Sequence, residues 1–343
     1  MKKFKNPHIK DKRFYNHEHD TVLSGSFFKS FYMFVNAWLR RKKITKEQSL
    51  AWFEKITPKK TSIKPVITWI GHASFLIQIG GVNILTDPIF GNASSFYPRF
   101  LPAGIEAHEL PPIDFVLISH NHRDHMDRKS LLAVRNHQNM TVLVPQGDKQ
   151  WFDNRAFERT YEFMWWKQHD VYPKNSLGKK IVFTFLPAAH WSQRGLFDKN
   201  KCLWGSWMIE YDGYSIYFGG DTCYAEHFAE IGSEFPFIDC ALLPIGPCNP
   251  RHWVGHAHVD AHEAGQAFLD LGARSFFPMH WGTFPFGTDR FETPINGIKY
   301  WWSNNQDKLF AKELYLEKIG SPVVLQEKSI LIPEGVFGNI KRK

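Results

Sequence analysis

The chain has 343 residues, of which 43% are hydrophobic and 22% charged, as in a globular protein large enough to bury a substantial core. Its four cysteines form no C-x-x-C pair, which argues against a disulfide framework or a thiolate zinc site. No apolar run reaches about 18 residues, and no apolar stretch follows the basic start. We therefore expect neither a transmembrane helix nor a secretory signal, and we predict a cytoplasmic location.

The net charge of +8 is concentrated at the N-terminus. Residues 1–60 contain 15 Lys and Arg against 5 Asp and Glu, whereas the remaining residues contain 27 against 29. Because the positive charge avoids the rest of the chain, no specific nucleic-acid partner is expected.

An amphipathic helix is predicted within this basic segment, over residues 27–39. Its sequence, FFKSFYMFVNAWL, places the aromatic residues on one arc, and RRKK follows at 40–43. Such a helix docks on the protein's own body, or it lies on a membrane with its basic end at anionic headgroups. We expect peripheral membrane contact through residues 27–43, on the inner face of the membrane. A role at the edge of a homodimer is left open.

From residue 65 onward, short β-rich runs alternate with helical patterns. Turn residues such as the glycines at 80–81 separate several of the runs. Helical patterns lie at 128–137 and 260–272, the second with Asp260 as its expected N-cap. We predict a layered α/β (α+β) domain over residues 61–343, preceded by an N-terminal extension over residues 1–60. The expected strands are PVITWI, SFLIQI, VNILT, FVLIS, TVLV, IVFTFL, LWGSWMIE, YSIYF, CALLP and SFFPM.

The clearest chemical motif follows the run FVLIS. His120 and His122 are two residues apart, so in an extended chain their imidazoles point to one side and can bind one metal ion. Asp124 and His125 follow at the start of a helical pattern, where they suit a second ion. A pair of core histidines would need neither Asp124 nor His125, so H-x-H-x-D-H predicts a metal site.

Further metal-binding side chains stand at the ends of other predicted strands. His190 closes TFLPAAH, Asp221 follows YFGG, and His280 closes FFPMH. Strand ends on one edge of a layered fold are where ligand sites gather. Each residue alone is as easily a structural His or a turn Asp, but together with the first motif they predict a site for two metals.

The order of these motifs resembles that of the metallo-β-lactamase superfamily, over residues 65–285. The resemblance implies an αββα sandwich in which His120, His122 and His190 bind one metal. It also implies that Asp124, His125 and His280 bind the other, with Asp221 as the bridge. The motifs GHASFLIQ, LTDPIF, LPPIDFVLISHNHRDHMD, LWGSWMIE, GGDT, LLPIG, HVDAHEA and HWGTF are similar to those of the N-acylphosphatidylethanolamine-hydrolysing phospholipase D family.

Several residues have two interpretations at this stage. His258 matches an extra active-site His of the family, which binds phosphate or donates a proton, but it also stands just before a helix start. Asp87 is expected to fix the tautomer of a ligand His, or only to form a turn before Pro88. Asp127 does similar supporting work or caps the following helix. His72 approaches the site or only occupies a turn.

The resemblance implies a dinuclear phosphodiesterase with two divalent ions, and Zn²⁺ is expected because the donors are His and carboxylate. A metal-bound hydroxide would attack phosphorus, with Asp124 orienting the water, and release phosphatidic acid and N-acylethanolamine from the lipid. The alternative is a soluble hydrolase of a sugar-phosphate lactone or a cyclic phosphodiester. A nuclease and a di-iron redox protein are weaker alternatives, because the charge avoids the body and no four-cysteine electron-transfer segment is present.

Overall fold

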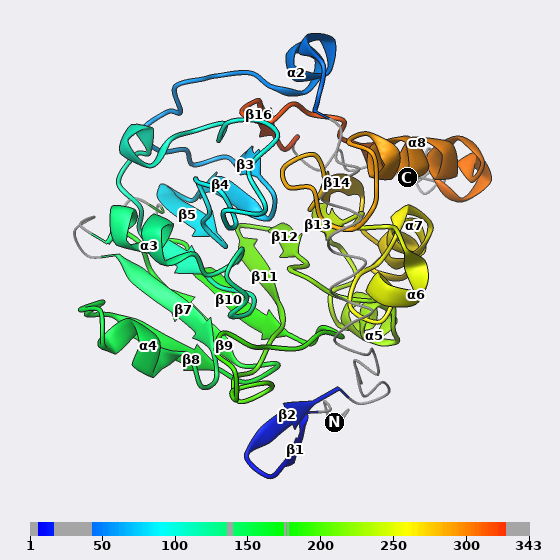
Figure 1. Ribbon diagram of the computed structural model, residues 1–343. Coiled ribbons are helices and arrows are strands. Elements are labelled where there is room, and N and C mark those ends of the chain that lie inside the picture. The colour runs from blue at the N-terminus through cyan, green and yellow to red at the C-terminus, as the bar shows by residue number, and fades with distance from the viewer. Residues whose placement is uncertain (1–5, 17–42, 136–139, 175, 177, 327–343) are drawn as a thin grey trace, which may run out of the picture.

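The computed structural model describes residues 6–16, 43–135, 140–174, 176 and 178–326, and the account below concerns these residues (Figure 1). The predicted helix at 27–39 lies outside them, as does all of the 27–43 segment except Lys43. No helix of the described residues is long and apolar enough to span a bilayer.

Two mixed sheets of seven strands each form the centre of the molecule. The first sheet has the order β16 (Pro322–Val324), β3 (Val66–Gly71), β4 (Ser74–Ile79), β5 (Val82–Thr86), β6 (Phe115–Leu117), β7 (Thr141–Pro145) and β8 (Thr160–Phe163). The second has the order β15 (Glu313–Leu314), β14 (Ser275–Met279), β13 (Cys240–Pro244), β12 (Tyr214–Phe218), β11 (Ser206–Tyr211), β10 (Ile181–Leu186) and β9 (Gln168–Val171).

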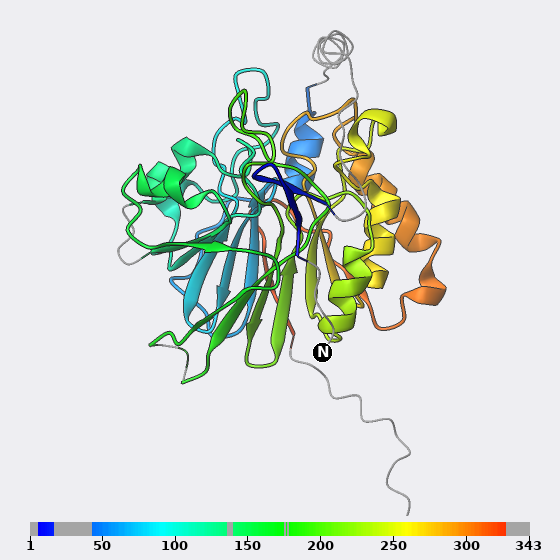
Figure 2. The same ribbon diagram turned by 90° about the horizontal axis from the view of Figure 1, so that it is seen from below.

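Helices cover the outer face of each sheet, and Figure 2 shows the resulting four layers. The first sheet carries α3 (Arg128–Val134) and α4 (Lys149–Asp153), whereas the second carries α5 (His227–Glu234), α6 (Arg251–Val254), α7 (Ala261–Asp270) and α8 (Thr293–Ser303). This arrangement confirms the predicted αββα sandwich. Strands β3, β4, β5 and β10 are buried along their whole length because both faces of each sheet are covered.

Aromatic side chains fill the space between the sheets. Phe115 of the first sheet meets Phe183 of the second with ring centroids 4.9 Å apart. Phe75 likewise meets Phe277 at 5.3 Å, edge to face. These contacts hold the two sheets in fixed register, so the strand ends that carry the predicted ligands stay in place relative to one another.

The two sheets repeat one pairing pattern. In the first sheet, β16, β3, β4 and β5 pair antiparallel, and β5 to β8 pair parallel. In the second, β9 to β12 pair antiparallel, and β12 to β15 pair parallel. By this pattern β3 corresponds to β10, and β5 corresponds to β12.

Two described parts of the expected N-terminal extension contact the sandwich. The hairpin of β1 (His8–Lys10) and β2 (Arg13–Tyr15) buries Phe14, whose N–H donates to the carbonyl of Asn200 at 2.8 Å. Helix α2 (Lys46–Trp52) begins at a capping box formed by Thr45 and Gln48 and buries Trp52. The domain division at residue 60 stays a prediction.

Candidate metal centre

The predicted ligands meet at one end of the sandwich, each just after a strand. The H-x-H-x-D-H motif follows β6 of the first sheet. His190 follows β10, Asp221 follows β12 and His280 directly follows β14, all in the second sheet. The site is therefore built across the junction of the two sheets.

One group of potential metal donors contains His120, His122, His190 and Asp221. One donor atom from each lies within 4.8 Å of the others. His122 Nδ1 lies 2.8 Å from His120 Nε2 and 3.2 Å from His190 Nε2. These are the residues that the resemblance implies for the first metal together with its bridge.

The second group contains Asp124, His125 and His280, as predicted, and adds His72. Its donor atoms also lie within 4.8 Å of one another. His72 Nε2 lies 3.1 Å from Asp124 Oδ2 and 3.2 Å from His125 Nε2, and its ring centroid is 4.0 Å from that of His280. The sequence left His72 undecided between the site and a turn, and the structure places it inside the site.

Asp221 lies between the two groups. Its Oδ1 is 3.0 Å from His280 Nε2, and its Oδ2 is 3.2 Å from His125 Nε2. The same Oδ2 is 3.8 Å from His190 Nε2, on the other side. A carboxylate that faces both donor groups has the position required of a bridging ligand.

Gly220 explains how Asp221 reaches this position. Its φ is +58°, and an added Cβ would lie 2.6 Å from the Cβ of Ser119 on the first sheet. This left-handed conformation favours glycine, and a residue with a Cβ would clash with Ser119. The first sheet and the loop after β12 therefore meet at Gly220.

Burial keeps most of the imidazoles neutral. It lowers the pKa of His122 to about 4 and those of His72 and His190 to about 3, with neighbouring charges as smaller influences. Neutral imidazoles offer the lone pairs that bind metal ions. For His125, burial acts in the same direction, but the carboxylates of Asp221 and Asp124 outweigh it and raise the pKa well above its usual value.

A buried carboxylate orients two of these ligands from behind. Asp87 Oδ2 lies 2.8 Å from His125 Nδ1, and the Ser119 hydroxyl donates to the same oxygen at 2.5 Å. Ser119 Oγ also lies 2.9 Å from His120 Nδ1. The bond to Asp87 leaves His125 Nε2 turned toward the donor group, which is the position expected of Asp87 in the tautomer-fixing interpretation. Asp127, by contrast, caps α3 through the N–H of Ser130.

Backbone carbonyls orient two further ligands. His190 Nδ1 is 2.9 Å from the carbonyl of Ala257, and His280 Nδ1 is 2.9 Å from that of Gly246. In both rings Nε2 then faces the site. The carbonyl of Ala257 comes from the segment that also carries His258, so this segment helps to build the centre.

His258 stands at the edge of the centre, with its Nδ1 3.7 Å from Asp221 Oδ2 and 19% of its side chain exposed. It therefore lies next to the carboxylate between the two donor groups, and part of its ring is accessible to solvent. Asp260, two residues later, caps α7 as predicted by accepting hydrogen bonds from the N–H groups of His262 and Glu263.

The donor set suits divalent cations, because it contains buried polar atoms that nothing else satisfies. His280 Nε2 and Asp221 Oδ1 are buried and lie 3.0 Å apart, yet they form no hydrogen bond of regular geometry with each other or with another described residue, and the buried His258 Nδ1 likewise has no hydrogen-bond partner among them. Unsatisfied buried atoms of this kind are rare in folded proteins and call for a bound group. Imidazole and carboxylate donors without thiolates match Zn²⁺, Fe²⁺ or Mn²⁺.

Fold and site together define a class: an αββα sandwich with a His- and Asp-rich centre at the ends of both sheets. Residues 82–281 match the family model described as "Beta-lactamase superfamily domain". The chain belongs to the β-lactamase superfamily, and the predicted resemblance is confirmed.

Individual relatives point in the same direction. N-acyl-phosphatidylethanolamine-hydrolyzing phospholipase D 1 of Caenorhabditis elegans is 34% identical over 235 residues, which are 65% of each chain. A metal-dependent hydrolase of Nitratidesulfovibrio vulgaris is 30% identical over 67% of this chain and 86% of its own length. The enzyme class, metal-dependent hydrolase, agrees with the prediction. The chain spans just under two thirds of the C. elegans protein.

Solved structures share the fold. Igni18, a metallo hydrolase from Ignicoccus hospitalis, superimposes with a TM-score of 0.59 at 21% sequence identity, over 77% of this chain and all of that one.

Proposed function

We propose that this chain is a dinuclear metal-dependent phosphodiesterase that hydrolyses N-acylphosphatidylethanolamine-type phospholipids to phosphatidic acid and N-acylethanolamine. The observation that carries the proposal is the position of Asp221 between two groups of metal donors. The name of the C. elegans relative, at 34% identity, supports the choice of substrate.

Two divalent ions bound in these groups would lower the pKa of water and neutralise the negative charge that develops on phosphate oxygens. His120, His122 and His190 would hold the first ion. His72, Asp124, His125 and His280 would surround the second, and Asp221 would contact both. Zn²⁺ is the expected ion, because the donors are imidazoles and carboxylates.

Asp124 is the proposed residue for orienting the attacking water. Burial alone would raise its pKa, but the charge on His125 and the hydrogen bond from His72 outweigh burial and lower it. Its carboxylate therefore stays ionised and can accept a hydrogen bond from the attacking water. Since 21% of the Asp124 side chain is exposed, it also faces the side from which substrate arrives.

His258 is the proposed partner of the phosphate group. Burial lowers its pKa to about 3, so the ring is neutral near pH 7 and can donate one N–H hydrogen bond. This state favours binding of a phosphoryl oxygen, and donation of a proton to the leaving alcohol is the alternative. In the balanced reaction, the water oxygen bonds to phosphorus, the bond to the ethanolamine oxygen breaks, and that oxygen gains a proton.

The test is to incubate metal-loaded protein with N-acylphosphatidylethanolamine, other phospholipids and cyclic phosphodiesters in ¹⁸O-labelled water, and to identify the products by mass. Label in phosphatidic acid, with none in the N-acylethanolamine, is expected. Turnover of only a cyclic phosphodiester or a sugar-phosphate lactone would replace the lipid proposal by the soluble alternative.

The matched variant for this test is Asp221→Asn, which keeps the size of the side chain and removes its charge. We expect activity to fall by more than about a hundredfold. An exposed control on α4, Asp153→Asn, should leave activity unchanged. If Asp221→Asn keeps full activity, Asp221 is not a bridging ligand and the proposal is wrong.

A further inference from the structure

The loop between β10 and β11 carries two adjacent apolar side chains that are almost fully exposed. Leu196 is 85% exposed and Phe197 is 83% exposed. Single exposed apolar residues are ordinary on protein surfaces, but two consecutive ones at a loop tip form a convex apolar point that calls for a partner.

Hydrogen bonds hold this tip in place. The carboxylate of Asp198 accepts from the N–H of Gly195 at 2.8 Å and from that of Arg194 at 3.3 Å. From the other side, the Arg13 guanidinium of β2 donates to the carbonyls of Phe197 and Lys199. Leu196 and Phe197 are therefore exposed on a turn whose backbone is fixed by hydrogen bonds.

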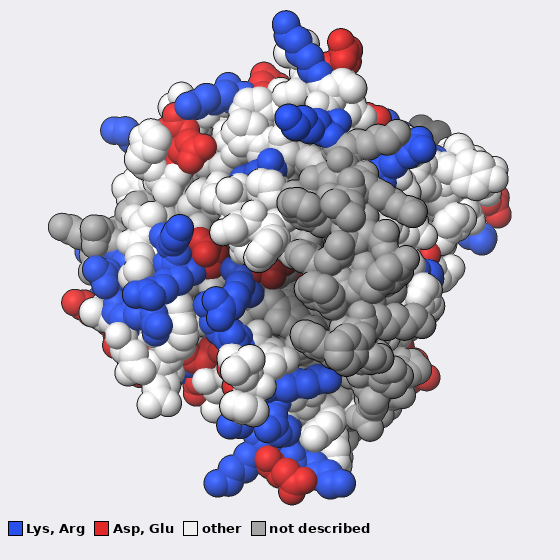
Figure 3. All heavy atoms as spheres, in the orientation of Figure 1, with Lys and Arg blue, Asp and Glu red and all other residues white. Residues whose placement is uncertain are grey.

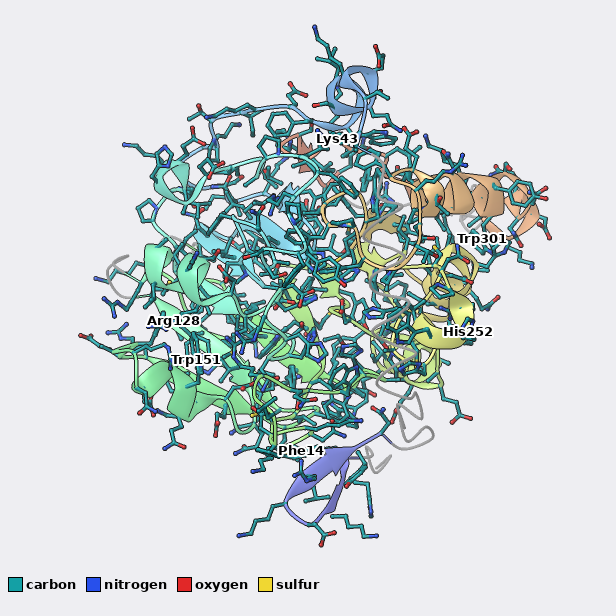
Figure 4. All side chains as sticks on the ribbon, in the orientation of Figure 1. Phe14, Lys43, Arg128, Trp151, His252 and Trp301 are labelled. Atoms are coloured by element: carbon teal, nitrogen blue, oxygen red, sulfur yellow. The ribbon has the colours of Figure 1, made fainter. Side chains whose placement is uncertain are left out.

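Exposed basic side chains lie on the segments that contact this loop: Arg123 Nη2 donates to the carbonyl of Arg194 at 3.0 Å, and the hairpin contacts the loop through Arg13. Lys10 and Lys12 of the β1–β2 hairpin are exposed, as are Arg123 and Lys201. Asp11 and Asp198 are acidic residues of the same region, and Asp198 is engaged in the turn. On the face shown in Figure 3, Lys and Arg gather along this hairpin and over α3 and α4, where Figure 4 labels Arg128 and Trp151.

The same loop is attached to the candidate metal centre. Arg194 Nη1 donates to the carbonyl of Asn121, within the ligand motif, at 2.9 Å and to that of Met126, directly after it, at 2.8 Å. The ring of Trp191 lies 4.3 Å from that of His122, centroid to centroid. A surface that engages this loop therefore engages a segment in direct contact with the ligand motif.

We infer that Leu196 and Phe197 insert into the headgroup region of an anionic bilayer, with the exposed Lys and Arg side chains of the contacting segments on the lipid phosphates. An apolar tip combined with basic side chains suits such interfaces, because buried apolar area and charge attraction add. This contact is separate from the predicted one at residues 27–43. It rests on the proposed function only in that the membrane would also supply the substrate.

The experiment measures partitioning of the full-length, metal-loaded protein onto vesicles of phosphatidylcholine, with and without phosphatidylglycerol. The double variant Leu196→Ser/Phe197→Ser should bind the anionic vesicles about tenfold more weakly. The matched control is Phe310→Ser, since Phe310 is 88% exposed on the segment before β15, and it should bind like the parent. Equal binding by all three proteins, or an equal loss in both variants, would overturn the inference.

Direct insertion is tested with Phe197→Trp and vesicles of brominated lipid. Tryptophan fluorescence should be quenched more in this variant than in Phe310→Trp, and equal quenching would contradict insertion.

If the loop instead binds an acidic protein, and the chain does not partition onto lipid vesicles, the inference is also overturned. Hydrolysis of a soluble phosphodiester should be unchanged in the double variant. Vesicle binding without lipid hydrolysis would refute the proposed function and leave this inference standing.

Discussion

Three residues of the candidate centre have left-handed backbone conformations that side-chain-bearing residues rarely adopt. The φ angles of His72, Asp87 and His280 are +56°, +32° and +60°. Each such conformation costs about 1–3 kcal/mol, which the surrounding structure must offset. The hydrogen bond from the N–H of His280 to the carbonyl of His72, at 3.1 Å, links two of them. Other described residues, such as Ala156 and Trp166, share this conformation, but at these three positions it aims side chains at one point.

The repeated strand pattern strengthens the case for His72. It follows β3, and the predicted ligand His190 follows β10, which is the corresponding strand of the second sheet. Asp87 and Asp221 likewise follow the corresponding strands β5 and β12. The two halves of the molecule thus each supply a His and an Asp from the segments that follow corresponding strands.

Replacing His72 by Ala is expected to weaken retention of the second metal ion by about 10–100-fold while the first is kept. The reason is that His72 Nε2 approaches both Asp124 and His125, as described above. Metal content after titration with a chelator measures this effect. His169→Ala, a change on β9 remote from the ligand set, serves as the control. If metal retention is unaltered in His72→Ala, His72 only occupies the turn and does not bind the metal.

Asp148 predicts a pH dependence of stability outside the metal centre. It is buried at the start of α4, and burial raises its pKa to about 7, although Asn121 donates to its Oδ1 at 3.1 Å. A carboxyl group with a higher pKa in the folded state binds its proton more tightly when folded. Its stabilising effect is complete below about pH 4 and is lost as the pH rises through 7.

Asp148→Asn should therefore flatten the pH profile of the free energy of unfolding. Relative to the parent, the variant should gain roughly 2–4 kcal/mol between pH 4 and pH 8, and denaturant unfolding across this range measures the gain. Asp153→Asn, on the same helix but 46% exposed, should show no such gain. The buried histidines of the centre also change the profile of the parent, so the test is the difference between variant and parent; a difference that does not grow with pH in this window would contradict the assignment.

At the scale of elements, the close packing of α7 against α8 requires a glycine in α7. Gly265 is buried in α7, and an added Cβ would lie 2.3 Å from the indole ring of Trp301 in α8. Alanine is the better helix former by about 1 kcal/mol, but here the clash should outweigh that gain.

We expect Gly265→Ala to lower the free energy of unfolding by about 1–3 kcal/mol, as measured by denaturant titration. Gly91→Ala is the control, because nothing lies within 4 Å of an added Cβ at that loop position. A variant at 265 as stable as the parent would show that the helices can separate without loss.

The sequence predicted the central strands well and the edge strands poorly. Strands such as β4 and β10 are uninterrupted apolar runs, because both faces are covered. The sequences of β8 (TYEF) and β9 (QHDV) mix polar and apolar residues, and both strands lie at sheet edges. Short edge strands bury too few side chains to show a recognisable hydrophobic pattern in the sequence.

The site was predictable to the extent that its residues are tied to strand ends. His190, Asp221 and His280 each follow an apolar run, so the layered fold alone brings them together. His72 also follows such a run, but the short turn between β3 and β4 gave no sign of the direction of its ring. That direction depends on the contact of its N–H with the Thr283 hydroxyl, at 2.6 Å and 211 residues away in the chain.

At the scale of the whole molecule, the candidate centre joins the two sheets. Two donor loops belong to the first sheet, namely the β3–β4 turn with His72 and the loop after β6, and three belong to the second, after β10, β12 and β14. Metal ions bound there would stabilise the folded chain by mass action, since the unfolded chain does not assemble the site.

Loading with metal is therefore expected to raise the unfolding temperature, by roughly 5–10 °C at an ion concentration near 100 times the dissociation constant. Calorimetry of the loaded and chelated protein measures the shift. Asp221→Asn should show a much smaller shift, because it lacks the carboxylate that faces both groups. An equal shift in that variant would place the bound metal elsewhere.

The four edge strands are connected in pairs by the chain itself: β8 continues into β9, and β15 into β16. Each connection crosses from one sheet to the other, at opposite margins of the sandwich. Relative sliding of the sheets is thus limited by covalent chain on both margins. Cutting the chain within either connection should therefore loosen the spacing of the donor loops even where the aromatic interior is intact.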